Sequence, residues 1–496
     1  VDKLFTYIVP EEYKNVIKIG HRVLVPFNNK LIEGFVLNIS NQYNGEYELK
    51  RIEKLCDEEP ILNQEMLYLG EAIQKKILCS RISIYQAMLP KALKAKCNTN
   101  IGIKKDRYIV LDKNKKEISD YLDGCKYEMQ KDILEQLLIN DRIKVSKLNS
   151  SIETLYKKGL IRYEYEEVNR YNSNCSGKYH VVKLNQEQQA AVDKVELNKF
   201  KTYLLHGVTG SGKTEVYMEL IDKVISQGKT AIMLVPEISL TPQIVDRFIT
   251  RFGSEIAILH SGLSEVEKYD EYRKILTGKV KIVVGARSAV FAPLKNIGII
   301  VIDEEHTSTY KQDNNPRYHA RDVAMMRGKY YNAPVILGSA TPSLESFARA
   351  LNGVYELLTL KNRAGAGRLP KIEIVDMKEE ARHGNFILSK SLTDKIWDRL
   401  RKREQIILLL NRRGYSSMLT CRDCGSVIKC PNCDISLTYH KSSNTNRCHY
   451  CNYSIKNVNR CPKCGSENMK DYGLGTEKLE EELNKVFKAR VIRMDM

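Results

Sequence analysis

The sequence predicts a multidomain α/β protein whose largest part is a parallel β-sheet flanked by helices. Between residues 182 and 360, short apolar segments alternate with segments of helical spacing, which is typical of parallel sheets. Four Cys-x-x-Cys pairs between Cys421 and Cys464 indicate a separate metal-binding module. A chain of 496 residues also exceeds the roughly 250–300 residues at which single cores stop growing, so several domains are expected.

The composition is that of a globular, strongly basic protein. Lysine and arginine number 79 against 61 acidic residues, and the formal charge of +18 stays strongly positive even if eight thiolates bind two zinc ions. Such a balance favours a polyanionic partner such as nucleic acid, although a lysine-rich surface that only promotes solubility is an alternative. No apolar run approaches the roughly 18 residues of a membrane span and no secretory signal opens the chain, so we expect a cytoplasmic protein.

Residues 1–104 are expected to form a small β-rich domain followed by helix. His21–Phe27 and Leu31–Ile39 have strand-like composition, and Asn28-Asn29-Lys30 between them is a turn signal. Glu65–Leu78 has the apolar spacing of a helix.

Residues 105–170 are expected to form a second small domain. An apolar helical face runs from Met129 to Leu138, a second helix covers Ser151–Lys158, and Arg162–Val168 alternates as a strand does. Two helices followed by a β-wing predict a winged helix, a variant of the helix-turn-helix DNA-binding fold, with a generic helical linker domain as the alternative. A polar linker, residues 171–181, leads into the α/β core.

The first α/β segment, residues 182–365, is expected to contain six buried strands. They are short apolar runs, which is the pattern of strands that are covered on both faces. In chain order they are Tyr203–His206, Ala231–Val235, Ile256–His260, Ile282–Gly285, Ile299–Asp303 and Val335–Gly338.

The segment after the first of these strands matches the phosphate-binding pattern G-x-x-x-x-G-K-[ST]. A helical segment follows it, as the pattern requires, so a chance match in a turn is the weaker alternative. Glycines let the backbone curl so that amide groups face phosphates, Lys213 should reach the β- and γ-phosphates of ATP, and Thr214 should bind Mg²⁺. The loop consists of Gly207, Val208, Thr209, Gly210, Ser211, Gly212, Lys213 and Thr214.

Acidic residues follow the strand Ile299–Asp303, at the edge where ligands bind in parallel sheets. Asp303 would hold Mg²⁺, and Glu304 would position and deprotonate the attacking water. Either acid alone is compatible with an ordinary surface carboxylate. Together with the phosphate-binding loop, the pair indicates hydrolysis of a nucleoside triphosphate.

Five segments together resemble the motifs of superfamily 2 helicases. Their amino-acid sequences are even more similar to those of the bacterial primosomal replication-restart helicases. The resemblance implies a RecA-like first lobe, in which Gln188 reads adenine. It also implies that His306 and residues 339–341 couple hydrolysis to DNA movement. The segments are GVTGSGKT (207–214), LVPEISLTPQ (234–243), GARSAVFAP (285–293), DEEH (303–306) and GSATPS (338–343).

The segment after DEEH interleaves aromatic and cationic side chains. Aromatic faces can stack unpaired bases while cations hold phosphates, and a solvated surface loop is the alternative. In the resembling family this aromatic-rich loop senses single-stranded DNA and triggers hydrolysis. The expected DNA-binding residues are Tyr310, Lys311, Arg317, Tyr318 and Arg321.

The four Cys-x-x-Cys pairs predict two structural zinc sites of four thiolates each. Spacing does not decide which pairs share an ion, and redox activity is the weaker alternative. The resemblance implies that the two outer pairs bind one zinc and the two inner pairs the other. His440 and His449 could compete as ligands, but eight thiolates already satisfy two ions, so we expect both histidines to be bystanders. The outer pairs are Cys421, Cys424, Cys461 and Cys464, and the inner pairs are Cys430, Cys433, Cys448 and Cys451.

The resemblance extends to the amino-terminal domain through LFTYIVP (4–10) and RVLVPF (22–27). In the family this domain captures the 3′ end of a nascent strand at a stalled fork. Phe5 would stack on the terminal base, and Lys50 would approach the backbone. Two positions depart from the family pattern, because Thr6 stands where an aspartate is common and Asn28 where a glycine is common.

A second, incomplete RecA-like lobe is expected to start at residue 366. Residues 366–417 should begin it, with Ile406–Leu410 as a buried strand; residues 418–467 would form a zinc-binding insertion, and residues 468–496 what remains of the lobe. No late stretch of the Q-x-x-G-R-x-G-R kind follows, and Arg412 and Arg413 are not at the family's arginine-finger positions. We therefore expect this lobe to be truncated.

The sequence thus predicts an ATP-dependent 3′→5′ DNA helicase that recognises stalled or branched forks and initiates primosome assembly for replication restart. Its cofactors would be ATP, Mg²⁺ and two zinc ions. The resemblance implies forked and single-stranded DNA, primosome loader proteins and single-stranded DNA-binding protein as partners, a nucleoid-associated location in a bacterium, and a monomeric state. The alternative is a non-catalytic DNA- and zinc-binding fragment that still binds nucleotide.

Overall fold

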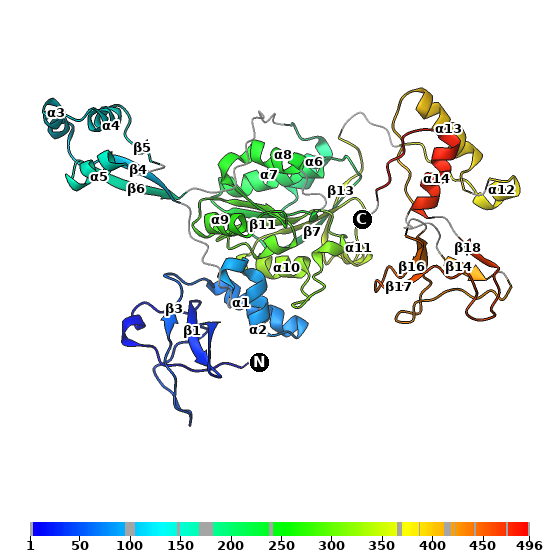
Figure 1. Cartoon of the computed structure of the whole chain (residues 1–496), viewed down its shortest axis with the longest axis horizontal. Coiled ribbons are helices and arrows are strands. Elements are labelled where there is room, and N and C mark those ends of the chain that lie inside the picture. The colour runs from blue at the N-terminus through cyan, green and yellow to red at the C-terminus, as the bar shows by residue number, and fades with distance from the viewer. Residues whose placement is uncertain are drawn as a thin grey trace. The chain divides into compact units, whose positions relative to one another are not determined.

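The computed structural model divides the chain into two compact units, residues 1–368 and residues 369–496 (Figure 1). Among the described residues, no helix combines the length and the hydropathy that a membrane span requires. The described residues are 3–94, 105–145, 149–167, 182–237, 242–364, 370–385, 387–410, 418–421, 423–440, 443–472 and 475–494.

The first unit contains a seven-stranded parallel sheet with the order β13-β7-β12-β11-β8-β10-β9. The six predicted strands are confirmed, with ends that differ from the prediction by at most two residues. The edge strand β13 is not among the predicted ones. The strands are β7 (Thr202–Gly207), β8 (Thr230–Leu234), β9 (Ile256–Leu259), β10 (Ile282–Gly285), β11 (Ile297–Ile302), β12 (Val335–Ser339) and β13 (Glu356–Leu360).

Helices cover both faces of this sheet (Figure 1). Because side chains alternate along a strand, Val301 of β11 points into one apolar cluster while Ile300 and Ile302 point into the other. This double burial explains why the strands are continuous apolar runs. One face carries α6 (Gln186–Asp193), α7 (Lys213–Ser226) and α8 (Pro242–Phe252); the other carries α9 (Glu265–Leu276), α10 (Ala320–Tyr331) and α11 (Leu344–Leu351).

The amino-terminal part is a three-stranded antiparallel sheet of order β2-β1-β3 followed by two helices. The predicted turn is present, because Asn28 and Asn29 have φ angles of 44° and 58°, a left-handed geometry that asparagine tolerates. Helices α1 and α2 share an apolar cluster with the central sheet. The elements are β1 (Arg22–Phe27), β2 (Lys30–Phe35), β3 (Lys54–Leu55), α1 (Gln64–Ile77) and α2 (Arg81–Met88).

The described residues 105–145 and 149–167 form three helices and a three-stranded antiparallel sheet of order β5-β4-β6 around their own apolar cluster. Leu134 and Leu137 are buried as expected, but Met129 is 62% exposed, so the apolar face of its helix starts later than predicted. The elements are β4 (Lys105–Leu111), α3 (Lys115–Asp123), α4 (Glu128–Ile139), β5 (Ile143–Lys144), α5 (Ser150–Lys157) and β6 (Ile161–Glu167).

In its described residues, the second unit combines three helices with short strands around the cysteine pairs. The predicted strand Ile406–Leu410 is wrong, because no strand is formed at these residues. Ile406 and Leu408 pack against α13 and α14, whereas Ile407 and Leu409 are 94% and 95% exposed. The alternation suits a strand, but no described segment pairs with it. The elements are α12 (Met377–Arg382), α13 (Lys390–Arg401), β14 (Met418–Cys421), β15 (Thr438–His440), β16 (Thr445–Arg447), β17 (Ser454–Lys456), β18 (Met469–Tyr472) and α14 (Thr476–Phe487).

Candidate functional site

The phosphate-binding loop connects β7 to the start of α7 at the carboxyl edge of the sheet. Gly210 and Gly212 both have φ of 79°, which residues with a side chain rarely adopt. A Cβ atom on Gly212 would also lie 2.3 Å from Nε2 of Gln188. The loop closes through a 2.9 Å hydrogen bond from Ser211 N to Val208 O, which brings it to the amino end of α7, where backbone N–H groups favour anions.

The polar groups of this loop fit a chain of phosphates. Nζ of Lys213 donates to the carbonyl oxygen of Gly207 at 3.0 Å, so a cation lies within the loop. The hydroxyl of Ser211 is buried and has no hydrogen-bond partner among the described residues. A buried hydroxyl without a partner is costly, and a phosphate oxygen would satisfy it. Thr214, half-buried in the first turn of α7, lies beside Lys213 in the chain.

Gln188 supports the loop in this structure. Its Oε1 accepts from Asn185 N at 2.9 Å, in a capping box at the start of α6, and its Nε2 donates to Ser211 O at 2.9 Å. The side chain is 3% exposed. The expected contact with adenine stays a prediction, and the contacts present are those of a residue that holds the phosphate-binding loop in place.

A segment that the sequence reading missed also contacts this loop. Ala364 N donates to Gly210 O at 2.9 Å, and the amides of Asn362 bind the carboxylate of Glu187 at 3.1 and 2.6 Å. Between them, the Arg363 side chain lies 3.9 Å from the position of a Cβ atom on Gly210. Nε of Arg363 is buried and unpaired within the described chain. The sequence does contain a signal for this contact, because Arg363 is a cation that shortly follows a strand. That strand, β13, was not predicted, so the signal was not recognised.

Asp303, directly after β11, has its carboxylate fixed by Tyr217 of α7. The Tyr217 phenol donates to Asp303 Oδ1 at 3.0 Å. Burial raises the pKa of Asp303, and the neighbouring Glu304 carboxylate raises it further, while the Tyr217 hydrogen bond and the Lys213 cation act in the opposite direction. A bound divalent cation would stabilise the ionised carboxylate, so these residues fit Mg²⁺. Tyr217 is a second residue that the sequence reading missed.

Glu304 and His306 lie at the same edge of the sheet. Glu304 has φ of 45°, a left-handed geometry that costs a non-glycine residue energy and that is concentrated at functional sites. His306 Nδ1 lies 2.8 Å from Ser339 Oγ and 3.6 Å from Glu304 Oε2. Ser339 Oγ also accepts from Thr341 N at 2.9 Å. The structure therefore joins the acidic motif, residues 303–306, to residues 339–341, which were expected to couple hydrolysis to DNA movement.

The aromatic-rich loop differs from the expectation. Tyr310 and Tyr318 are 1% and 3% exposed, because they belong to the apolar cluster of the central sheet. Tyr310 donates to Asp303 O at 2.7 Å, and Tyr318 packs edge-on against Phe291 with ring centroids 4.9 Å apart. The expected stacking of bases on these two rings is therefore wrong for this structure, since neither ring face is accessible.

The cations of this loop divide into two kinds. Arg321 is also corrected as a DNA contact, because it is mostly buried and bonded to Glu305 at 3.0 Å. Lys311 and Arg317 are exposed and remain available to phosphates. Both side chains also bond within the loop, since Lys311 Nζ donates to Arg317 O at 2.6 Å and Arg317 Nε donates to Asp313 O at 3.0 Å.

The predicted 3′-end residues lie on the surface of the amino-terminal sheet domain. Phe5 is 48% exposed and packs edge-on against Phe27, with ring centroids 4.9 Å apart. Lys50 is exposed, and its carbonyl accepts from Ile8 N at 2.9 Å, which fixes the two segments side by side. Thr6 is exposed as well.

The eight cysteines form two separate clusters, in which all four sulfur atoms lie within 4.8 Å of one another. One cluster consists of the outer pairs and the other of the inner pairs, as predicted. In each of the four pairs, the second cysteine is followed by a residue with φ between 54° and 75°. The same tight turn is therefore formed four times. These residues are Gly425, Asp434, Asn452 and Gly465, all of types that tolerate this geometry. Four convergent thiolates are the ligand set of structural zinc.

The two nearby histidines do not join these clusters. Nε2 of His440 lies 3.0 Å from Nε2 of His449, and Nδ1 of His440 lies 3.3 Å from Glu477 Oε1. Their expected role as bystanders agrees with this pairing.

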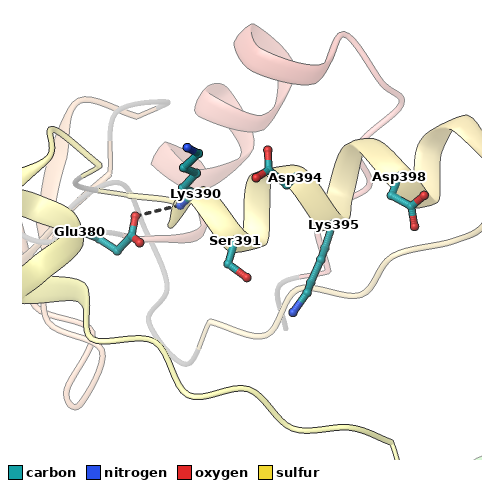
Figure 2. Close-up of a pocket in the computed structure, with 6 residues that line it drawn as sticks. All are labelled: Glu380, Lys390, Ser391, Asp394, Lys395 and Asp398. Atoms are coloured by element: carbon teal, nitrogen blue, oxygen red, sulfur yellow. Dashed lines mark hydrogen bonds between the residues drawn. The ribbon is translucent and has the colours of Figure 1, made fainter.

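A polar pocket in the second unit offers no comparable site (Figure 2). None of its lining side chains is buried, and the cations and anions alternate along the helix, so no single ligand charge is favoured. The dashed line marks the 2.9 Å hydrogen bond from Lys390 N to Glu380 Oε2. The lining residues are Glu380, Lys390, Ser391, Asp394, Lys395 and Asp398.

Comparisons with known proteins match these parts in chain order. Residues 1–90 match the 3′ DNA-binding domain of PriA, residues 185–350 the DEAD/DEAH box helicase domain, and residues 430–456 the Cys-rich region of the PriA DNA helicase. The replication restart protein PriA of Bacillus subtilis (strain 168) is 42% identical over 573 residues, covering 100% of this chain and 71% of that protein. The chain belongs to the PriA family.

Other PriA proteins give the same result. The protein from Chlamydia muridarum is 35% identical and is matched over 100% of this chain and 68% of its own length. The protein from Chlamydia pneumoniae is 45% identical over 63% of this chain and 43% of its own length. Among solved structures, RecG bound to a three-way DNA junction is similar with a TM-score of 0.29 and 22% identity, over 45% of this chain and 31% of RecG. PriA membership and the helicase match identify the enzyme class as a DNA helicase and ATPase.

Several predictions lie wholly or partly outside the described residues, among them the polar linker of residues 171–181. Arg412 and Arg413, which were not expected to act as arginine fingers, are among residues 411–417. Residues 238–241 of the predicted helicase segment 234–243 are likewise not described.

Proposed function

We propose that this chain is the ATP-hydrolysing, 3′→5′ unwinding part of a replication restart protein that acts at stalled or branched forks. The observation that carries this proposal is the meeting of the phosphate-binding loop with the acidic motif at one edge of the sheet. Tyr217, one turn after Lys213, is bonded to Asp303, and Lys213 is close enough to lower the Asp303 pKa. ATP and Mg²⁺ are the proposed ligands, beside two zinc ions.

Each residue has a defined task in the proposed reaction. The loop amides, Ser211 Oγ and Lys213 Nζ would hold the β- and γ-phosphates. Asp303 and Thr214 would orient Mg²⁺, which supplies charge stabilisation to the transferred phosphoryl group. Glu304 would accept the proton of the attacking water. Through the His306–Ser339 hydrogen bond, a change at the nucleotide would be transmitted to the segment that follows β12.

The DNA surfaces are proposed on exposed residues only. Phe5 and Lys50 are accessible for a 3′ end, and Lys311 and Arg317 for a single-stranded backbone. The overall charge of +18 supports a polyanionic partner. The proposal includes primosome loader proteins and single-stranded DNA-binding protein as further partners, a cytoplasmic, nucleoid-associated location and a monomeric state.

A second candidate is nucleotide and DNA binding without hydrolysis. It is favoured by the second unit, in which Ile406–Leu410 forms no strand and exposes Ile407 and Leu409. Large apolar side chains left exposed in this way are unusual for a lobe that must close on ATP.

ATP hydrolysis by this chain, measured with and without forked DNA, separates the two candidates. The first predicts DNA-stimulated hydrolysis that Lys213→Ala abolishes and a matched surface variant, Lys223→Ala on the same helix, does not. Unwinding of partial duplexes with either a 3′ or a 5′ single-stranded tail then tests the polarity. ATP binding without any hydrolysis sensitive to Lys213→Ala would leave the second candidate.

A further inference from the structure

Two histidines of the second unit face each other beside the cysteine clusters. Nε2 of His440, at the end of β15, lies 3.0 Å from Nε2 of His449, which stands between Cys448 and Cys451 in the chain. The ring centroids are 5.0 Å apart, with an interplanar angle of 63°. The rings therefore converge through nitrogen atoms of the kind that bind metal ions in proteins.

A carboxylate of α14 orients the first of these rings. Nδ1 of His440 lies 3.3 Å from Oε1 of Glu477, in the first turn of α14, and the Glu477 side chain is only 11% exposed. A carboxylate accepts hydrogen bonds, so Nδ1 of His440 carries the proton and the lone pair of the neutral ring is on Nε2. Histidines that bind metals usually have this arrangement, because a hydrogen bond from the second nitrogen fixes the ring.

The contact between the two rings is a hydrogen bond in which His449 donates. Since Nε2 of His440 has the lone pair, the proton between the rings belongs to Nε2 of His449. His449 is exposed, so water can carry this proton to Nδ1 of the same ring. In that second tautomer of His449, two lone pairs face each other. A metal ion can then bind between the rings without any change in their charge.

The separation of the two nitrogen atoms indicates the type of ion. With metal–nitrogen bonds of about 2.0–2.1 Å, a separation of 3.0 Å gives an N–metal–N angle of about 95°. This angle is closer to the right angle of a tetragonal site than to the wider angle of a tetrahedral site. Divalent nickel and copper favour tetragonal coordination by nitrogen and oxygen, whereas structural zinc is tetrahedral. Water molecules would complete the coordination.

We propose that His440 and His449 form a third metal site, which binds Ni²⁺ or Cu²⁺, and that Glu477 is the positioning residue that orients His440. The site is separate from the two zinc clusters, because each of those has four thiolates of its own. It joins β15 and the inner cysteine cluster to α14. The apolar cluster around the cysteines is distinct from that of α13 and α14, so a bound ion would add a fixed connection between the two.

Titration calorimetry with Ni²⁺ on the full, zinc-loaded chain tests this site. Excess Mg²⁺ in the buffer keeps Ni²⁺ from sites made of carboxylates alone, and mass spectrometry measures the zinc content before and after the titration. The variants are His440→Gln, His449→Gln and Glu477→Ala. The matched control is His383→Asn, at an exposed histidine of the same unit.

The unchanged chain and His383→Asn should each bind one Ni²⁺ ion and keep both zinc ions. Glu477→Ala should weaken Ni²⁺ binding by about 10–100-fold, the usual effect of removing the partner that orients a ligand, and loss of either histidine should weaken it further. Ni²⁺ should also raise the unfolding temperature of the unchanged chain but not that of His449→Gln, because it binds the folded state. His449→Gln stays informative if the other variants fail to fold, since this side chain is exposed.

Three results would overturn the proposal. The first is that the unchanged chain binds no Ni²⁺ beside its two zinc ions. The second is that His449→Gln binds Ni²⁺ as tightly as the unchanged chain, which would place the ion elsewhere. The third is that Ni²⁺ binds only as zinc is lost, which would place it at the thiolates. None of these measurements needs ATP hydrolysis, so the outcome is independent of the proposed function.

Discussion

The phenol of Tyr217 donates a hydrogen bond to the carboxylate of Asp303 across 3.0 Å, at the junction between the phosphate-binding helix and the central strand. Tyr217 is fully buried. Gly338 makes room for it, because a Cβ atom there would lie 1.6 Å from the Tyr217 oxygen. Two of the helicase segments, 303–306 and 338–343, therefore meet the helix that follows the phosphate-binding loop around one hydroxyl. This contact fixes the direction in which Asp303 can present its free oxygen.

Replacing Tyr217 by Phe should weaken the use of Mg²⁺. Loss of a hydrogen bond to a charged group is worth about 1.5–3 kcal/mol, so the Mg²⁺ concentration for half-maximal ATPase activity should rise about tenfold or more. Removing the donor also removes one influence that lowers the Asp303 pKa, so the carboxylate becomes harder to ionise. A Mg²⁺ titration of the initial rate checks this. Tyr203→Phe, at a buried tyrosine whose oxygen accepts from Glu196 N, is the control and should leave the midpoint unchanged.

Arg363→Ala should weaken nucleotide binding. Its side chain lies over Gly210, and its Nε is buried without a partner in the described part of the chain, so a phosphate or ribose oxygen is the natural acceptor. Loss of a charge-assisted hydrogen bond corresponds to about tenfold or more in affinity. Titration of a fluorescent ATP analogue measures it, with the exposed neighbour Lys361→Ala as control. Equal affinities of both variants and the unchanged chain would show that Arg363 only packs on the loop.

The central sheet was predictable because its inner strands are covered on both faces and so read as apolar runs. β13 lacks this signal, since it is an edge strand in which Thr359 is exposed and Glu356 half-buried. The phosphate-binding loop was found from its spacing, because glycines at fixed positions are a backbone requirement. The pairing of cysteines needed the family resemblance, since four equivalent turns permit several pairings.

The aromatic-rich loop shows where a residue pattern is ambiguous. Alternating aromatic and cationic residues suit a base-stacking surface, and they equally suit a segment whose rings enter the core while its cations face water. The second arrangement is the one found, because the rings of Tyr310 and Tyr318 are buried in the core. Gln188, Arg363 and Tyr217 act through contacts between segments far apart in the sequence, which no local pattern encodes.

His319 should make the stability of this region depend on pH. Its Nδ1 accepts from Arg321 N at 3.2 Å as the cap of α10, which requires the neutral ring. Burial lowers the His319 pKa; Arg321 and Lys311 lower it further, while Asp322 and Glu305 act oppositely. The unfolded state therefore binds the proton more readily, and the stabilisation, complete above the unfolded pKa of about 6.5, is lost as pH falls below it.

His319→Asn isolates this effect, because asparagine caps a helix without titrating. Between about pH 5 and 7, the unfolding temperature of this variant should depend less on pH than that of the unchanged chain. Relative to His319→Asn, His319→Ala should lose about 1 kcal/mol at all these pH values, since the cap is gone. His383→Asn, at an exposed histidine, is the control. Identical pH profiles for His319→Asn and the unchanged chain would contradict the assignment.

Cys448→Ser should remove one zinc ion and leave the other. Cys448 is buried within the inner cluster, whose four sulfur atoms are separate from those of the outer cluster. A site with three thiolates binds zinc far more weakly than one with four. Metal content measured by mass spectrometry should fall from two zinc ions per chain to one. Cys125→Ser, outside both clusters, should keep both ions; loss of both ions in Cys448→Ser would show that the two sites fold as one.

Helices α1 and α10 are joined by two ion pairs that should differ greatly in their effect on stability. Glu65 and Arg327 are 3% and 1% exposed in their side chains, and the carboxylate also accepts from the Tyr331 hydroxyl at 2.8 Å. Lys76 and Asp322 form a 3.0 Å pair between the same two helices, but their side chains are 50% and 34% exposed.

Glu65→Ala should destabilise the first unit by about 3–5 kcal/mol, because it leaves the Arg327 cation buried without its counter-charge. Lys76→Ala should cost at most about 1 kcal/mol, since water solvates the remaining carboxylate. The double variant Glu65→Leu/Arg327→Met should recover much of the loss, because no charge then stays buried. Urea unfolding of all four chains measures these differences. Equal losses for Glu65→Ala and Lys76→Ala would show that burial does not govern this contact, and an unrecovered double variant would show that the pair itself stabilises the helix junction.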